Sequence, residues 1–163
     1  MAKHNLLDKC DRALVAYLIS ENAGTVDDVF PGKDSSLKTL PCTICDSLIA
    51  RPVASPFSGV WEVHIAIIVR TLGIFEQPAD NENDVPAERS GDRIGITYDA
   101  LHKGLLDSGD TLALAITDAA HGAGVLDFTV DNVMPDEIIR GFEGKGDGWM
   151  DKFLLRLIAR PSD

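Results

Sequence analysis

One stretch decides the fold, and it reads Val60-Trp61-Glu62-Val63-His64-Ile65-Ala66-Ile67-Ile68-Val69. Its apolar groups recur at every second position, the period that an extended strand imposes. One face carries the large apolar side chains of Trp61, Val63, Ile65, Ile67 and Val69. The other face mixes polar and apolar groups, namely Glu62, His64, Ala66, Ile68 and Arg70. We therefore expect a strand that packs on helices with its first face and is half covered on its second.

The sequence before this strand predicts a helix and a further strand. Residues 6–20 form a helix with one apolar face, made of Leu6, Leu7, Cys10, Leu14, Tyr17 and Leu18. Gly24 is a stop signal for this helix. Residues 24–39 read as a long loop, and residues 40–50 read as a strand that opens near Pro41. The segment 51–59 is a connector.

The sequence after the strand predicts two helices and then two strands with a short segment between them. The first helix spans 93–106 with the stripe Ile94, Tyr98, Leu101 and Leu105, and the second spans 110–120 with Leu112, Ala115, Ile116 and Ala119. The strand segments are 125–133, 137–142 and 149–159, with a glycine-rich turn at 144–148. The order is α-β-β-α-α-β-β. Because the strands arrive in pairs with short links, we expect an α+β fold, with an antiparallel or mixed β-sheet packed against helices.

Length and charge set further limits. The chain has 163 residues, which suits a single domain spanning 1–163 that buries a core without a metal or a disulfide. Its formal net charge is −11, which disfavours binding to duplex DNA but is compatible with DNA passing by without specific binding. No apolar run is long enough to span a bilayer, so no membrane is expected and the cytoplasm is the default compartment.

The segment 76–92 departs from the rest of the chain in composition. It holds six acidic residues against one base, and Val85 is its only large apolar side chain. Such a stretch cannot bury enough surface to order itself, so we predict a mobile acidic surface loop, which is either a solvated insertion or a segment that orders only against a neighbour. We expect a subunit interface formed by Glu76, Asp80, Glu82, Asp84 and Glu88, together with Trp149 at the start of the last strand.

Three motifs resemble chemical sites, and each has a simpler structural reading. The pair Cys42 and Cys45 matches C-x-x-C, but an odd separation in a strand sends the two side chains to opposite faces. Asp118 and His121 precede glycines, a pattern typical of the end of a helix. The stretch 141–148 is rich in glycine but lacks the G-K-[ST] ending of a phosphate loop, and it reads as a hairpin turn. We therefore predict no catalytic residue, no bound cofactor and no metal site.

The layout resembles the tail-terminator, or tail-completion, proteins of long-tailed bacteriophages. The resemblance begins with the amphipathic helix at 6–20 and continues with a strand that opens on a proline, Leu40-Pro41-Cys42-Thr43-Ile44. It includes a long strand led by glycine, Gly59-Val60-Trp61-Glu62-Val63-His64-Ile65. It closes with a turn and a strand that begins at an aromatic residue, Asp147-Gly148-Trp149-Met150-Asp151-Lys152-Phe153-Leu154-Leu155.

The resemblance implies a structural virion protein without an active site. Such a subunit forms a ring, a hexamer in this family, that caps the tail tube and joins it to the head connector. It is assembled in the host cytoplasm and resides at the junction of tail and head. Alternatives of the same class are a head-closure or connector protein and a subunit like those of the tail tube. Alternatives of other classes are a small cytoplasmic enzyme centred on Asp118 and His121, and an adaptor that binds a partner through its acidic loop.

Overall fold

The computed structural model describes residues 6–32, 42–55, 58–71, 90–107, 109–142 and 149–161. It contains three helices and five strands over these residues. The helices are α1 (Leu6–Ser20), α2 (Ser90–Asp107) and α3 (Gly109–Gly122). The strands are β1 (Val29–Pro31), β2 (Cys42–Pro52), β3 (Trp61–Thr71), β4 (Phe128–Phe142) and β5 (Trp149–Pro161).

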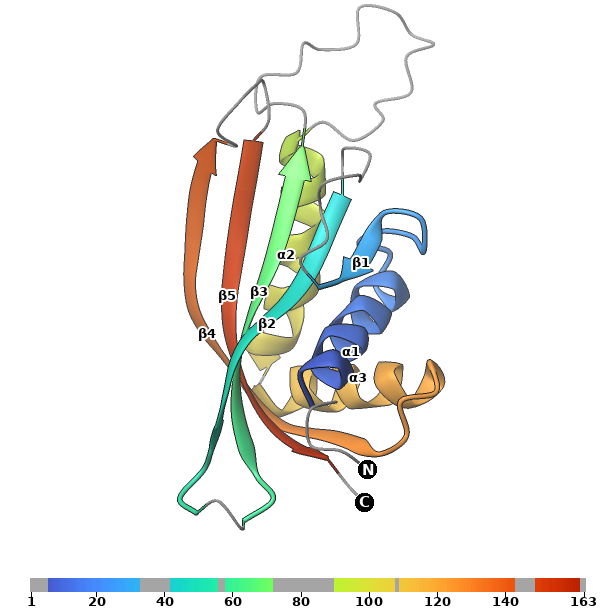
Figure 1. Ribbon diagram of the computed structural model, residues 1–163. Helices are drawn as coiled ribbons and strands as arrows, with labels where there is room; N and C mark the ends of the chain where they lie inside the picture. The colour runs from blue at the N-terminus through green and yellow to red at the C-terminus, as the bar shows by residue number, and fades with distance from the viewer. Residues whose placement is uncertain are drawn as a thin grey trace, which may run out of the picture.

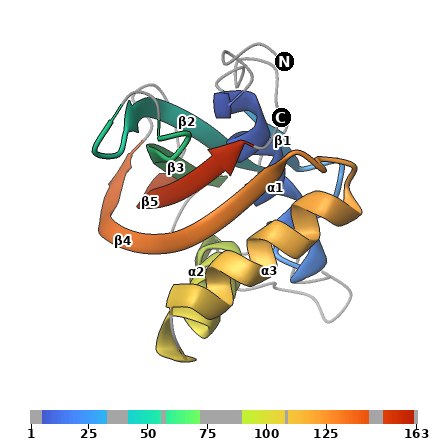
Figure 2. The same cartoon turned by 90° about the horizontal axis from the view of Figure 1, so that it is seen from below.

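The five strands form one mixed sheet in the order β1-β2-β3-β5-β4. Only β1 runs parallel to its neighbour; the pairs β2–β3, β3–β5 and β4–β5 are all antiparallel. The helices lie on one side of this twisted, curved sheet, with α3 beside the first part of β4 (Figures 1 and 2). The predicted α+β fold, with a mixed sheet packed against helices, is confirmed.

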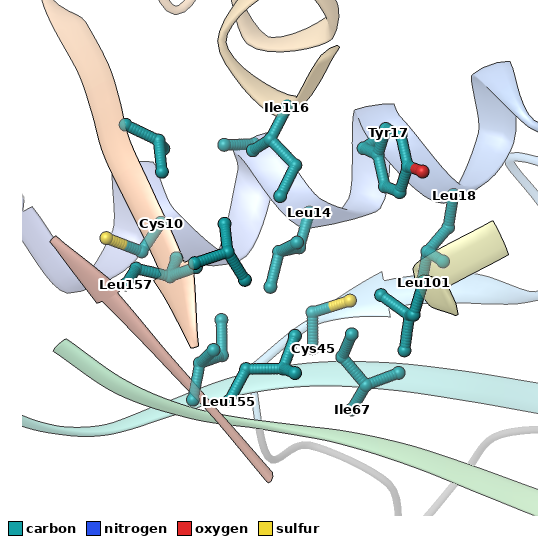
Figure 3. Close-up of a cluster of buried hydrophobic side chains, with 14 of the residues drawn as sticks. Cys10, Leu14, Tyr17, Leu18, Cys45, Ile67, Leu101, Ile116, Leu155 and Leu157 are labelled. Carbon is teal, nitrogen blue, oxygen red and sulfur yellow. The ribbon is translucent and has the colours of Figure 1, made fainter. Parts of the chain in front are cut away.

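The core lies between the helices and one face of the sheet. Along β3, Val63, Ile65, Ile67 and Val69 are buried on the helix side, as the alternation predicts. The predicted face of α1 is also confirmed, since Cys10, Leu14 and Leu18 are fully buried and meet Ile67 and Leu155 across the interface (Figure 3). Trp61 packs against this core while staying partly exposed, so its predicted core position is confirmed only in part.

The prediction missed one strand and divided another into two, and both errors have a local cause. The expected loop at 24–39 contains β1, which pairs with Thr43–Cys45 and is too short, at three residues, to show a period. The expected strands at 125–133 and 137–142 are one strand, β4. Its register shifts between Val130 and Asn132 and again between Pro135 and Glu137. Each bulge inserts a residue and interrupts the alternation, so one strand reads as two.

The buried face of α2 also differs from the predicted stripe. Tyr98 is 41% exposed, whereas Arg93 is 2% exposed and is the largest fully buried side chain among the described residues. The Arg93 guanidinium lies 2.9 Å from Asp28 Oδ1, and its Nε donates to Thr43 Oγ1 at 3.1 Å. The ion pair ties α2 to the segment before β1, and the hydrogen bond ties it to β2, so a charged residue outside the predicted stripe belongs to the buried face of α2.

Most of the predicted acidic loop and subunit interface lies outside the described residues. This holds for Glu76, Asp80, Glu82, Asp84 and Glu88, and for the side chain of Trp149, whose backbone begins β5. The last three residues of the predicted loop belong instead to α2, which begins at Ser90. No helix among the described residues is long and apolar enough to cross a membrane.

Candidate functional site

The C-x-x-C pair sits in β2, and its two thiols leave opposite faces of the sheet, as predicted. Cys45 pairs with Ile67 and joins the core under the helices, whereas Cys42 pairs with Arg70 on the other face. Both are fully buried, and burial raises the pKa of the Cys45 thiol above its ordinary value. The described residues contain no group of three or more histidine, cysteine or acidic side chains placed to hold a metal ion.

His121 ends α3, as predicted, and its ring contacts the backbone of β4. Its Nε2 lies 2.8 Å from the carbonyl oxygen of Phe128, and because a carbonyl only accepts, this nitrogen is the donor. Gly124 has φ +88°, which supplies the left-handed turn after the helix. Asp118 points to solvent one turn earlier. The arrangement therefore gives His121 a structural contact with the edge of the sheet.

This contact belongs to a series that covers the free edge of β4. In an antiparallel ladder, alternate residues turn both backbone groups toward one neighbouring strand. Applied to the observed registers, this alternation turns Phe128, Val130, Val133, Pro135 and Ile138 away from β5. The prediction agrees with the contacts, because His121 bonds to the Phe128 carbonyl at this edge.

Most of these outward positions are already satisfied or blocked. Thr117 Oγ1 accepts from the Val130 N–H at 2.9 Å, and Asn132 Oδ1 accepts from the Val133 N–H at 2.8 Å. Pro135 has no N–H to offer. Among the described residues, Ile138 is the first outward position along β4 at which no such partner is found. Over the part of the chain that the structure describes, cover of the β4 edge therefore extends along its first half and ends at Ile138.

The opposite edge of the sheet follows the same pattern on β2. The N–H of Thr43 donates to the Asp28 carbonyl at 2.8 Å, and the Cys45 carbonyl accepts from Gly32 at 2.7 Å, so β1 covers these positions. The N–H of Ser47 donates to Asp11 Oδ1 of α1 at 2.7 Å. A bulge then follows between Ser47 and Ile49.

No described residue covers the next outward position on β2, Ala50. The hairpin bond from the Val53 N–H to the Val60 carbonyl, at 2.9 Å, fixes the alternation beyond the bulge. It turns the backbone of Ile49 and Arg51 toward β3 and that of Ala50 away from it. Ala50 on β2 and Ile138 on β4 therefore hold equivalent positions. Each is the outward residue at which cover by described residues ends.

Exposed aliphatic side chains flank both open positions. Leu48 and Ile49 are each 45% exposed on β2, and Ile138 and Ile139 are 54% and 44% exposed on β4. A charged, exposed residue lies near each pair: Arg51 is two residues after Ile49 on β2, and Glu137 directly precedes Ile138 on β4. Unpaired edge strands with apolar side chains are templates for pairing with another chain.

An apolar groove adjoins the open part of β4. It has a volume of about 440 Å³ and lies between α2 and the strands β4 and β5, lined among others by Tyr98, His102, Pro135, Ile138 and Phe153. The rings of Tyr98 and His102 are stacked with centroids 5.0 Å apart. The side chain of Ile138 therefore borders both the open edge and the groove, which extends the apolar surface at this end of the sheet.

Asp11 adds an electrostatic feature beneath the β2 edge. Burial raises the pKa of this carboxyl to about 6, against the lowering effect of hydrogen bonds from the Ser47 hydroxyl and backbone. Asp11 is 8% exposed and holds the residue at which the bulge begins. Helix α1 thus fixes the bulge, and through it the point at which the β2 edge opens.

Sequence reasoning placed the interface in the acidic segment and missed these two edges. A local signal was present in both: two adjacent aliphatic residues, Leu48-Ile49 and Ile138-Ile139, interrupt the alternation of polar and apolar residues. In a strand, adjacent side chains leave opposite faces, so one of each pair points away from the core.

No protein-family model matches this sequence, and no curated protein matches it.

Proposed function

We propose that the protein is a structural subunit that joins to copies of itself through the two open edges of its sheet and closes into a ring. Because the layout of the sequence resembles the tail-terminator proteins of long-tailed bacteriophages, we propose that this ring is a tail terminator. The observation that carries the proposal is the match between the edges. On each edge the described cover ends at one outward residue, Ala50 on β2 and Ile138 on β4, and exposed aliphatic side chains lie at or beside both positions.

The strand directions support a closed assembly. From β2 through β3 and β5 to β4 every step is antiparallel, so β4 runs opposite to β2. A copy rotated about an axis near the strand direction therefore brings its β2 antiparallel to the β4 of its neighbour. Such a contact joins two different surfaces of the subunit, and heterologous contacts of this kind form rings when the rotation closes.

The tail-terminator role gives this ring its partners. The resemblance of the sequence suggests a hexamer that binds the tail tube on one side and the head connector on the other, located in the virion. The net charge of −11 supports a wall that DNA passes without specific binding. A head-closure or tube-like subunit would share the ring and differ in its partners.

The mass of the protein in solution tests self-assembly. Size-exclusion chromatography with light scattering, over a range of concentrations, should give a defined multiple of 17.6 kDa. Ile138→Pro removes only an N–H that points away from β5, so the subunit should fold and stay monomeric. Ile138→Val retains that N–H and should assemble as the parent does. A parent chain that stays monomeric at all concentrations would refute the proposal.

Purified tail tubes test the biological role. The protein should bind at one end of each tube and stop its further growth, which electron microscopy of mixed samples can show. Rings that form but ignore tubes would favour a connector or another ring-forming function over the terminator role.

The groove beside α2 favours one alternative of a different class, a domain that binds a small apolar ligand. Its described lining is mainly apolar and aromatic and does not include Asp118 or His121, so it lends no support to an enzyme centred on those two residues. A thermal shift with small aromatic compounds in a strictly monomeric protein would favour this alternative.

A further inference from the structure

Resting on the proposed function, we infer the strand register that joins one copy to the next. Residues 49–51 of β2 in one copy pair antiparallel with residues 137–139 of β4 in its neighbour. Ala50 lies opposite Ile138, Ile49 opposite Ile139, and Arg51 opposite Glu137. The partner is therefore a second copy of this chain, bound by addition of a strand to each sheet.

The side-chain faces agree with this register. Residues directly opposite each other in a sheet share a face. Within the subunit, Ile49 pairs with His64 and Arg51 pairs with Glu62, which places both on the face away from the helices. On β4, Ile139 pairs with Lys152 and Glu137 with Leu154, which places them on the same face.

The two remaining residues also agree. Ala50 pairs with Val63 and Ile138 pairs with Phe153, so both lie on the helix side. Their opposition sets a small side chain against the 54% exposed Ile138, at the border of the groove. A slip of one residue would set apolar groups of one copy against the wrong face of the other.

The backbone groups agree independently. Ala50 and Ile138 are the outward positions, so in this register they form a hydrogen-bonded pair. The N–H of each donates to the carbonyl of the other. The flanking pairs, Ile49 with Ile139 and Arg51 with Glu137, then become non-hydrogen-bonded pairs, whose side chains approach most closely. Charge complementarity between Arg51 and Glu137 favours the heterologous contact over contact of either edge with itself.

The register also suits a closed arrangement. Ile49 pairs with His64, and His64 pairs with Arg156, so Ile49 lies at the level of Arg156 on β5. Ile139 pairs with Lys152, four residues away from Arg156 on the same strand. Because Ile49 of one copy lies opposite Ile139 of the next, neighbouring copies are offset by four residues along the strands. That offset is about 13 Å, and four strand spacings cover about 19 Å. The two lengths correspond to a strand tilt of about 35°, within the range of closed barrels. The contact is therefore of a kind that can repeat around an axis.

Engineered disulfides test the register. A chain carrying both Ile49→Cys and Ile139→Cys should cross-link to its neighbours under mild oxidation and give a ladder of covalent multimers, because a non-hydrogen-bonded pair has the spacing of a disulfide. The chain with Ile49→Cys and Ile138→Cys is the matched control. Its two cysteines lie on opposite faces and should not cross-link. The native Cys10, Cys42 and Cys45 are fully buried and should give little background.

Charge exchange gives a second measurement. Arg51→Glu or Glu137→Arg alone should raise the concentration needed for assembly by roughly ten-fold or more, since like charges then face each other at every contact. The double exchange should restore assembly. Arg12→Glu changes an exposed arginine on α1 and should have little effect.

The outcomes separate the register from the proposed function. If the parent chain forms no oligomer, the proposed function fails and the register with it. If it forms rings but the 49–139 cysteine pair gives no ladder and the charge variants assemble normally, the register is wrong and the ring uses another surface. Cross-linking through 49–138 in place of 49–139 would also overturn the register. A 49–139 ladder with rescue in the double exchange supports it.

Discussion

Replacing Asp11 with asparagine should remove one contribution to the pH dependence of stability. The carboxyl is 8% exposed, and its pKa is raised from 3.8 to about 6, chiefly by burial. The folded state therefore binds a proton more tightly than the unfolded state. Asp11 favours folding most at pH values below 3.8, and this contribution is lost as the pH rises through 6.

The size of the effect follows from the pKa difference. At about 1.4 kcal/mol per pH unit, a charged Asp11 above pH 6 costs the folded state up to roughly 3 kcal/mol relative to its neutral form. Asparagine imitates that neutral form and keeps an oxygen to accept from Ser47. Above pH 7 the Asp11→Asn variant should thus be more stable than the parent, by up to about 3 kcal/mol. Near pH 4 the two should differ little.

The assay is urea unfolding from pH 4 to pH 8, in the Arg51→Glu background so that assembly does not add to stability. Other carboxyl groups titrate in both proteins, so the informative quantity is the difference in unfolding free energy between variant and parent. Asp8→Asn removes an exposed carboxylate one turn away and should change stability by less than about 0.5 kcal/mol. A difference that does not vary with pH, or a variant that is less stable at pH 8, would refute the account of Asp11.

Other substitutions test the ion pair, a close approach and the thiols. Asp28→Ala leaves the buried guanidinium of Arg93 without its carboxylate and should cost about 3 kcal/mol in urea unfolding, whereas Arg93→Met leaves an aspartate that is already 23% exposed and should cost less. The pKa of Asp28 is lowered, since hydrogen bonds from Arg93 outweigh its burial, so this contribution should be lost as the pH falls below 3.8. Gly24→Ala should destabilise the fold by about 2 kcal/mol or more. The added Cβ would lie 2.3 Å from a neighbouring side chain, and the backbone of Gly24 has φ +152°, which alanine rarely adopts. The thiols of Cys42 and Cys45 should resist thiol reagents in the folded protein and react in denaturant, and the protein should purify without stoichiometric zinc.

The sequence predicted those parts of the fold in which period and packing agree. The alternation along β3 and the apolar face of α1 were both predictable because each buries one side against the same core. The β4–β5 hairpin was predictable from its glycine-rich turn, and the register confirms it by pairing Phe142 with Trp149.

The remaining features depend on contacts between distant segments. Arg93 is buried because Asp28, 65 residues away, supplies its charge partner, and no local pattern signals that pairing. The bulges of β4 likewise disguise a continuous strand. The candidate edges were missed for the same reason, since cover by Asp11 or Thr117 is visible only once the helices are placed against the strands.

Electron microscopy of the purified chain tests the central claim most directly. Class averages should show closed rings of one size with rotational symmetry, in which each copy contacts its two neighbours through different edges of its sheet. Separate copies at every concentration would contradict the claim. Two-fold pairs in which β4 meets β4 would contradict it as well, because that contact joins like edges and cannot close a larger ring.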